Sequence, residues 1–470
     1  MKTLVMKFGG SALGSAAALS QVLSIVLHES KKWTNLILVA SALEGVTDML
    51  FEAAHLAQMG SSRGYRRIAA TLRARHLGLI EELPLGNLES TALEADVDRL
   101  LFEMLDICQQ VASIPKENLS PEVGDRIAGV GERLSARIIA ALLRQNGLRG
   151  VAIDGTDVIV TDAGFGNAKA DIDLSEQRIK THLVPMLSRN IVPVVAGYIG
   201  VTPDGRPTTM GRGGSDYTAA TLSVCLNANE LWMWSDVDGL MSADPDEVPD
   251  ARVIDELSYV EVAELAYFGA RILHARMIQP LEDKRIPLRI RNVYRPQQPG
   301  TLVRHIDNAI EASRIKAITS IHGLALLASR SGDLHGIIGK IQDELVLALG
   351  TPADVMITAQ SSGHSMVCFV IPPHVGLGSL ESLRHSVQSR LHESEVPESW
   401  TTHVVSVATL IGVNLNHSSL TLAHILEQLG DLQLLGLAQG PSGCSVSLIM
   451  HPATAHEALG LLHQLTLIHL

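Results

Sequence analysis

Two glycine-containing segments in the first half of the chain carry positively charged side chains. In the first, Lys7 precedes Gly9, Gly10 and Ser11. Adjacent glycines let backbone N–H groups approach an anion without interference from Cβ, and a lysine ammonium can neutralise a phosphate. A strand is expected before this segment and a helix after it, so the positive end of that helix would add to the site. Taken alone, the segment also fits an ordinary turn after an edge strand.

The second segment, residues 208–216, reads Thr-Thr-Met-Gly-Arg-Gly-Gly-Ser-Asp. Gly213 and its neighbour leave backbone donors open, and Arg212 offers a planar fork for a carboxylate or phosphate. Ser215 or Asp216 is placed to cap the helix that follows. A flexible surface loop is the alternative, but glycines that flank an arginine and end at a helix cap favour a functional site.

Together the two segments predict a site for phosphoryl transfer. Such a site needs positive groups that hold like-charged reactants together and spread charge in the transition state. The chain has no G-x-x-x-x-G-K-[ST] segment and no G-x-G-x-x-G after its first strand. Both absences argue against P-loop and dinucleotide-binding folds.

Short apolar runs alternate with longer amphipathic stretches over the first 300 residues. Strands are expected at residues 3–6, 36–40, 150–153, 192–198, 231–235 and 287–291. Helices are expected at residues 16–30, 132–146, 174–189, 216–226 and 259–271. This alternation predicts βα units on a mostly parallel sheet, with a helical insertion at about residues 50–115.

The pattern changes near residue 304, and the chain then repeats itself. An Ala-Gln turn before a strand occurs at Ala359 and again at Ala438, an offset of 79 residues. A helix-like stretch precedes each copy, at residues 337–349 and 420–429. We therefore expect two βαβ-type modules of about 75 residues each.

The composition indicates a globular protein, since 46% of the residues are hydrophobic and 19% are charged. A formal net charge of -13 argues against a general nucleic-acid binder and against docking on anionic lipid. The four cysteines form no CxxC pair, which indicates buried thiols in a reducing compartment. No histidine pair has the H-x-x-x-H spacing of metal ligands, and no apolar run reaches the roughly 18 residues of a membrane span. A cytoplasmic location and no resident metal site are expected.

An ordered set of motifs resembles the aspartate kinases of the amino-acid kinase superfamily. The motifs lie at residues 7–11 (K-F-G-G-S), 41–48 (S-A-L-E-G-V-T-D), 131–136 (G-E-R-L-S-A), 209–219 (T-M-G-R-G-G-S-D-Y-T-A), 235–239 (S-D-V-D-G), 268–274 (F-G-A-R-I-L-H) and 299–303 (P-G-T-L-V). The match spans nearly all of residues 1–306.

The resemblance implies a three-layer α/β fold with a mostly parallel central sheet for the catalytic domain, residues 1–306. It also implies a regulatory region, residues 307–470, made of two ferredoxin-like (βαββαβ) ACT domains. The first ACT domain would cover about 322–395. The second would cover about 396–470 together with a strand near 312–320.

The resemblance assigns catalytic roles to Lys7, on the transferring phosphoryl group, and to Asp216, which would orient the basic groups. It implies amino-acid contacts from Ser41, Thr47, Glu132, Arg212, Gly213 and Ser215. Arg212 would bind the carboxylate and Glu132 the ammonium of the substrate. A plain helix cap also fits Asp216, and a helix-dipole role also fits Glu132.

The nucleotide contacts implied by the resemblance are Lys7, Gly9, Gly10, Ser11, Ser235, Asp236, Met241, Asp246, Arg271 and Ile272. The family usually has Tyr at position 241, Arg at 246 and Pro at 275. An aspartate in place of an arginine near phosphate adds repulsion, so an altered affinity for ATP is expected rather than loss of activity.

The predicted activity is phosphorylation of the side-chain carboxylate of L-aspartate by ATP with Mg²⁺, the first step toward lysine, threonine and methionine. Feedback inhibition at the ACT domains is expected, with lysine as the favoured effector, in at least a dimer. Two alternatives stay open. One is another amino-acid kinase, acting on N-acetylglutamate or glutamate, and the other is a non-catalytic amino-acid sensor.

Overall fold

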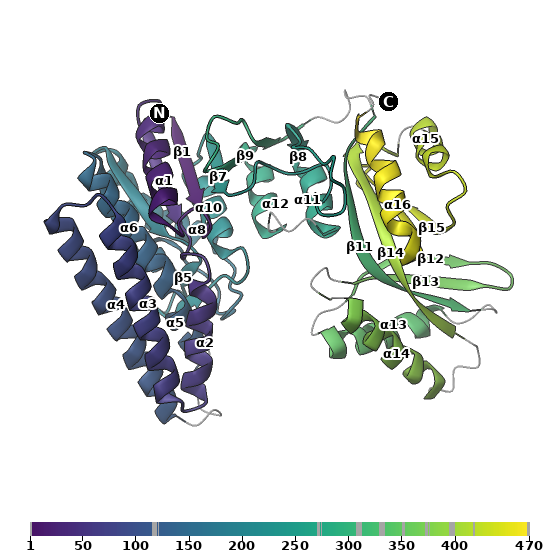
Figure 1. The fold of residues 1–470 in the computed structure, drawn as a ribbon, viewed down its shortest axis with the longest axis horizontal. Coiled ribbons are helices and arrows are strands. Elements are labelled where there is room, and N and C mark those ends of the chain that lie inside the picture. The colour runs from purple at the N-terminus through teal and green to yellow at the C-terminus, as the bar shows by residue number, and fades with distance from the viewer. Residues whose placement is uncertain are drawn as a thin grey trace. The chain divides into compact units, whose positions relative to one another are not determined.

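The computed structural model describes residues 2–114, 120, 122–269, 273, 275–306, 313–328, 334–349, 353–371, 375, 377–393, 400–416 and 419–467. The chain divides into two compact units (Figure 1). The first unit comprises Met1–Leu240, Asp255–Tyr259 and Leu273–His305. The second comprises Met241–Ile254, Val260–Ile272 and Ile306–Leu470.

An eight-stranded sheet forms the centre of the first unit, in the order β3-β4-β2-β1-β7-β9-β10-β8. Neighbouring strands are parallel except for the pair β9 and β10. The strands are β1 (Thr3–Phe8), β2 (Asn35–Ala40), β3 (Arg149–Ile153), β4 (Ile191–Ala196), β7 (Glu230–Ser235), β8 (Glu256–Ser258), β9 (Leu288–Asn292) and β10 (Thr301–Arg304). All six predicted strands are therefore present, because buried parallel strands need continuous apolar runs and these show in the sequence.

Helices surround this sheet, and three long ones extend from it side by side, as predicted for the insertion (Figure 1). These three are α2 (Val46–Gln58), α3 (Ser62–Glu82) and α4 (Asn87–Ser113). The others are α1 (Ala16–Glu29), α5 (Glu122–Ala128), α6 (Val130–Gln145), α7 (Gly155–Val158), α8 (Ile172–His182), α9 (Val184–Leu187), α10 (Gly214–Cys225) and α12 (Ala275–Asp283). One buried apolar cluster runs from β1 and β2 through α6 into α2, α3 and α4, so the insertion and the sheet share a core.

A small hairpin near the carboxyl end of β4 was not expected from the sequence. It consists of β5 (Ile199–Val201) and β6 (Pro207–Thr209), which pair with each other in a separate two-stranded sheet. Residues 203–205 (Pro-Asp-Gly) form the turn between the two strands, and strands of three residues are too short to produce a pattern in the sequence.

The second unit contains a six-stranded antiparallel sheet in the order β12-β13-β11-β14-β16-β15. Its strands are β11 (Arg314–Ala328), β12 (Val355–Gln360), β13 (Ser365–Val370), β14 (Trp400–Val413), β15 (Leu434–Gln439) and β16 (Ser445–Met450). Its helices are α11 (Tyr259–Tyr267, which begins in the first unit), α13 (Leu334–Leu349), α14 (Leu377–Glu393), α15 (Ser419–Leu429) and α16 (Pro452–His463), followed by the 3₁₀ helix η2 (Gln464–Leu467).

The predicted internal repeat is confirmed, because β12 and β15 begin at Val355 and Leu434, 79 residues apart. The long strands β11 and β14 pair from Arg314–Val413 to Ala328–Trp400 and run through both copies. One copy packs α13 and α14 against Leu324 and Leu326 of β11, and the other packs α15 and α16 around Ile318 of the same strand. Each copy is thus a βαββαβ arrangement, and the predicted fold class is confirmed.

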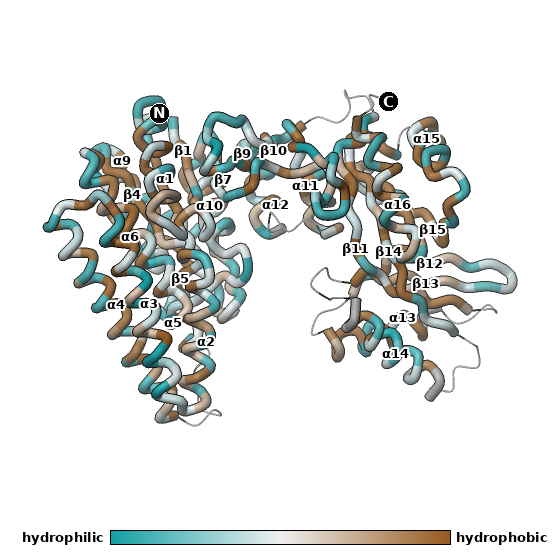
Figure 2. Tube along the Cα trace, in the orientation of Figure 1, coloured by the Kyte–Doolittle hydropathy of each residue, from teal (hydrophilic) through white to brown (hydrophobic). Residues whose placement is uncertain are grey.

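Hydrophobic residues follow the strands of both sheets, while polar residues gather in the loops and along the outer faces of helices (Figure 2). All four cysteines are free and buried, as predicted, and burial raises the pKa of the Cys108 thiol to about 11. In the described part of the chain, no helix combines the length and the apolarity that crossing a bilayer requires.

Candidate active site

Lys7 and Asp216 form an ion pair at the centre of the first unit. Lys7 is the penultimate residue of β1, and Asp216 lies in the first turn of α10. The distance from Lys7 Nζ to Asp216 Oδ1 is 2.5 Å, and both side chains are largely buried. The strand β1 lies between β2 and β7, where the strand order reverses direction, and ligands of open α/β sheets bind at the carboxyl ends of such strands.

The turn after β1 packs tightly against the neighbouring loops. The Gly9 N–H donates to the Trp234 carbonyl at 3.0 Å. A Cβ on Gly10 would lie 2.9 Å from the Ala42 carbonyl oxygen, so the chain can pass the loop after β2 only without a side chain here. The Ser11 hydroxyl donates to Asp236 Oδ1 at 2.9 Å. The turn is thereby fixed to the ends of both β2 and β7.

Glu132 lies in the first turn of α6 and is buried, with 3% of its surface exposed. Burial raises its pKa to about 8, although the Ala42 N–H and the charge of Lys7 act in the opposite direction. Within the described residues, its Oε2 atom has no hydrogen-bond partner. A buried carboxylate that lacks a partner is costly, so this oxygen is suited to accept hydrogen bonds from an incoming ammonium group.

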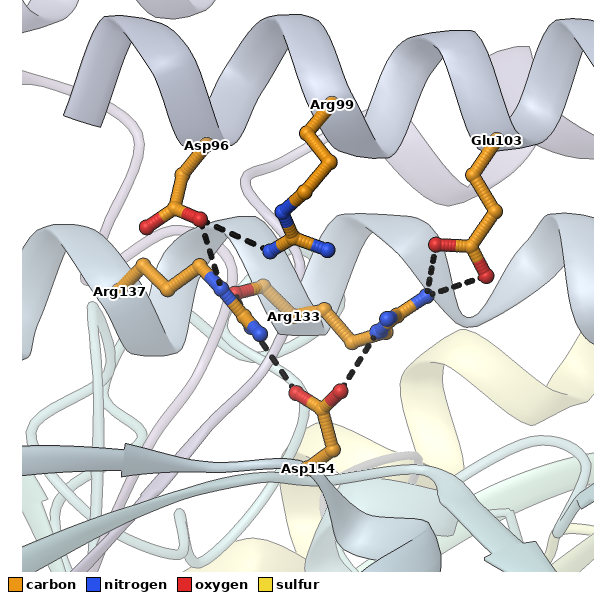
Figure 3. A network of polar contacts seen from close by, with 6 residues as sticks. All are labelled: Asp96, Arg99, Glu103, Arg133, Arg137 and Asp154. Carbon is orange, nitrogen blue, oxygen red and sulfur yellow. Dashed lines mark hydrogen bonds and ion pairs between the residues drawn. The ribbon is translucent and has the colours of Figure 1, made fainter. Parts of the chain in front are cut away.

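Glu132 lies on α6, and ion pairs between the arginines of this helix and acidic residues of neighbouring elements hold the helix in place (Figure 3). Asp154, just after β3, accepts from Arg133 Nε and from Arg137 Nη1, both at 2.9 Å. Arg133 also contacts Glu103 of α4 at 3.1 Å, and an Asp96–Arg99 pair on α4 lies beside Arg137. The network ties α6 to α4 and to the end of β3.

Replacing Asp154 with Asn is expected to destabilise the first unit by roughly 2–3 kcal/mol, since two partly buried guanidinium groups lose their shared partner. Burial alone would raise the pKa of Asp154, but Arg137 and Arg133 outweigh it and hold the pKa below its usual range. The stabilisation is therefore present above the pKa of the unfolded state and is lost as the pH falls through the folded pKa.

Urea unfolding of the wild type and the Asp154→Asn variant at pH 7 and in acid would measure this effect. Asp157→Asn is the matched control, because burial and the charge of Asp154 raise the pKa of Asp157 and outweigh the opposing charges of His182 and Arg133. An Asp154→Asn variant as stable as the Asp157→Asn control at pH 7 would contradict the role of the network.

The loop before α10 is positioned by Asp125, which the sequence analysis did not single out. Its carboxylate accepts from the Thr209 N–H at 2.9 Å, from the Thr209 hydroxyl at 2.8 Å and from the Gly166 N–H at 2.9 Å. These partners lie 41 and 84 residues away in the chain, so no local pattern could have revealed them.

The predicted capping of α10 by Ser215 or Asp216 is wrong. The N-cap is Gly213, which has a φ of +71° and makes no side-chain hydrogen bond. A left-handed glycine ends the loop two or three residues earlier than expected and leaves Ser215 and Asp216 inside the helix. The Asp216 carboxylate is therefore directed to Lys7 rather than to the helix end.

Tyr198 is a second residue that sequence reasoning missed. Its φ of +71° is unusual for an aromatic residue, and it is held by two backbone hydrogen bonds, to the Thr218 hydroxyl at 3.0 Å and from the Met210 N–H at 2.9 Å. Burial, with smaller contributions from the charges of Glu132 and Asp125, raises the pKa of its phenol to about 12. Strain of this kind concentrates at functional sites.

The remaining predicted residues divide into three groups. The first group is buried or half-buried in the first unit and consists of Ser41, which follows β2, Thr47, Ser215 and Ser235. Two other residues of this unit, Arg212 and Asp236, are exposed. Met241 and Asp246 belong to the second unit. Arg271 and Ile272 lie outside the described residues, so their predicted nucleotide contacts stay predictions.

Comparisons with known proteins agree with this architecture. The amino acid kinase family matches residues 2–292. Aspartokinase 2, chloroplastic, of Arabidopsis thaliana is 30% identical over 98% of this chain and 84% of its own length. Lysine-sensitive aspartokinase 3 of Escherichia coli is 29% identical over 77% of this chain and 79% of its own length.

A solved structure, E. coli aspartokinase III in complex with aspartate and ADP, has a TM-score of 0.75 and 26% identity, covering 99% of this chain and 100% of that one. The chain spans about half the length of the bifunctional aspartokinase/homoserine dehydrogenases that it matches at 28% identity. The chain belongs to the amino acid kinase family, in its aspartokinase branch.

Proposed function

We propose that the chain is an ATP-dependent aspartate 4-kinase, with residues 1–306 as the catalytic domain and 307–470 as the regulatory region. The observation that carries this proposal is the Lys7–Asp216 pair at the end of β1, with the Glu132 oxygen that lacks a partner acting on the same site. A relative of the same fold was crystallised with aspartate and ADP, which supports these substrates.

The reaction requires positioning and charge neutralisation more than proton transfer. A carboxylate oxygen of aspartate attacks the γ-phosphorus of ATP, the bond to the bridging oxygen breaks, and ADP leaves. The acceptor carboxylate is already ionised at pH 7, so no general base is needed. Lys7 neutralises the transferring phosphoryl group, and Asp216 holds the ammonium of Lys7 in place.

The substrate ends would be recognised by opposite charges. Glu132 accepts from the aspartate ammonium, and Arg212 binds its α-carboxylate. Further contacts would come from Ser41, Gly213 and the first turns of α2 and α10, which hold Thr47 and Ser215. Gly9, Gly10, Ser11, Ser235 and Asp236 would line the phosphates and nucleoside.

Magnesium would enter bound to the phosphates of ATP, as part of the substrate. In the described ranges of the chain, no group of three or more His, Cys, Asp or Glu side chains could hold a metal ion by itself. The ion would reduce the negative charge of the phosphates, while Lys7 would neutralise the transferred group.

A coupled assay for ADP, run with aspartate, glutamate and N-acetylglutamate in parallel, tests the function. We expect ADP release that depends on aspartate, together with an acyl phosphate that hydroxylamine traps as a hydroxamate. ADP release with glutamate or N-acetylglutamate, but not with aspartate, would favour another amino-acid kinase. No release with any acceptor would favour the non-catalytic sensor.

Regulation by lysine is a further part of the proposal. The two βαββαβ halves of the second unit and the similarity to a lysine-sensitive relative support it. We expect lysine to inhibit aspartate-dependent ADP release more strongly than threonine, in an assembly of at least two chains. Titration of both amino acids, with light scattering for the mass, would check this, and insensitivity to both would contradict it.

A further inference from the structure

One segment of the chain leaves the first unit and returns to it. It comprises residues 241–254, which belong to the second unit, while Leu240 and Asp255 on either side belong to the first. Both flanking residues are fixed to β10. The Leu240 N–H donates to Thr301 Oγ1 at 2.8 Å, and the Asp255 carbonyl accepts from the Leu302 N–H at 2.9 Å. The segment is thus an insertion into the first unit that packs in the second unit, and both of its ends are hydrogen-bonded to β10.

In the second unit, polar contacts hold this segment to the last helices of the chain. Ser242 Oγ lies 2.8 Å from His463 Nε2, and both residues are at most 2% exposed. The Ser242 carbonyl accepts from the Ile318 N–H of β11 at 2.8 Å. Arg252 Nη2 donates to the Thr466 carbonyl of η2 at 2.6 Å.

The segment also closes on itself at Ser242 and contributes to the core. Ser242 Oγ accepts from the Arg252 N–H at 3.0 Å, and the Ser242 N–H donates to the Arg252 carbonyl at 2.8 Å. Ala243 and Val248 are buried in the same apolar cluster as Leu459 and Leu462 of α16. Segment 241–254 therefore packs as an integral part of the C-terminal half of the second unit.

The upstream end of the segment leads directly to the candidate active site. Asp236 accepts from Ser11 Oγ in the glycine turn, and only residues 237–240 separate it from the segment. Asn292 of β9 donates to the Asp236 carbonyl at 2.9 Å and to Asp238 Oδ1 at 2.7 Å. Residues 237–240 therefore join the segment to the rim beside Ser11, and their hydrogen bonds to β9 and β10 make the link a fixed one, so the position of the segment bears on the geometry of the rim.

We propose that His463 is a positioning residue for nucleotide binding: through its buried hydrogen bond to Ser242 it sets segment 241–254, and thereby the Asp236 rim of the site. This inference rests on the proposed function for the identity of the nucleotide as ATP. The C-terminal helix α16 would in this way influence the affinity for ATP without touching it.

Steady-state kinetics of the full chain would test the proposal with the variants His463→Ala, His463→Gln and Leu467→Ala. We expect His463→Ala to raise the KM for ATP about fivefold, the effect of losing one buried hydrogen bond, with less than about twofold change in kcat and in the KM for aspartate. His463→Gln can keep a hydrogen bond to Ser242 and should restore the KM. Leu467→Ala, at an exposed position of η2, is the matched control.

An unchanged KM for ATP in His463→Ala, or equal changes for both substrates, would overturn the proposal. If His463→Ala does not fold, Ser242→Ala removes the same hydrogen bond from the other side, together with the bond from the Arg252 N–H, and should raise the KM for ATP by at least as much.

Hydrogen–deuterium exchange gives a readout that does not depend on activity. The backbone amides of residues 241–254 should exchange faster in His463→Ala than in the wild type, and at the wild-type rate in Leu467→Ala. Unchanged exchange in His463→Ala would contradict the docking. A wild type that releases no ADP with aspartate would instead remove the proposed function, and the exchange experiment would still decide whether His463 holds the segment.

Discussion

Replacing Lys7 with Met should lower kcat by about 10³-fold, because the transferring phosphoryl group loses the positive charge that neutralises it in a largely water-excluded site. The folded structure should survive, since Met keeps the length of the side chain and Asp216 remains 14% exposed to water. The coupled ADP assay at saturating aspartate and ATP measures the effect.

Two further measurements make the Lys7 result specific. Lys7→Arg keeps the charge but changes its geometry, so it should retain more activity than Lys7→Met. Circular dichroism and thermal unfolding of each variant would show that the fold is intact. A well-folded Lys7→Met enzyme with near-full turnover would remove Lys7 from the reaction and the phosphoryl-transfer assignment with it.

Replacing Glu132 with Gln should raise the KM for aspartate by 30-fold or more, about 2 kcal/mol, because the substrate ammonium loses a buried charged partner. The wild type should also show a pH dependence that the variant lacks. Its Glu132 has a pKa of about 8, so at pH 6.5 most of the carboxyl is protonated and must lose its proton to bind an ammonium. The KM for aspartate should fall about tenfold per pH unit up to pH 8 and then level off.

The stability of the free protein should change in the opposite direction. The pKa of Glu132 is raised in the folded state, so its ionisation opposes folding as the pH rises from the unfolded pKa to about 8. Glu132→Gln should therefore be more stable than the wild type at pH 8 while binding aspartate worse. Glu29→Gln is the control, since Glu29 is also buried but already bonded to Lys32 and Trp33. If the KM of Glu132→Gln for aspartate depended on pH as it does in the wild type, the result would contradict the ammonium site.

The sequence was sufficient to predict the central sheet, the helical insertion and the C-terminal repeat. Each of these produces a local signal: apolar runs for buried strands, amphipathic stretches for helices, and a recurring Ala-Gln turn for the repeat. The motifs likewise located the turn after β1 and the loop before α10, which the structure joins through Lys7 and Asp216.

The rest depended on contacts between distant residues. Asp125, Asp154 and Tyr198 hold the site through partners 12 to 84 residues away, and single polar residues give no pattern that a local analysis can detect. The start of α10 was misplaced because a left-handed glycine competes with serine and aspartate as an N-cap. The docking of residues 241–254 against α16 joins segments more than 200 residues apart.

The strands β11 and β14 run through both copies of the repeat. This sharing limits how the C-terminal half of the chain can recombine in evolution and how it unfolds. The second copy takes the N-terminal part of β11 from upstream of the first copy, so a cut between the copies would remove a central strand from the second one. Recombination could not exchange one copy for a foreign module at a single crossover. Chemical denaturation of this unit should accordingly show one cooperative transition rather than two.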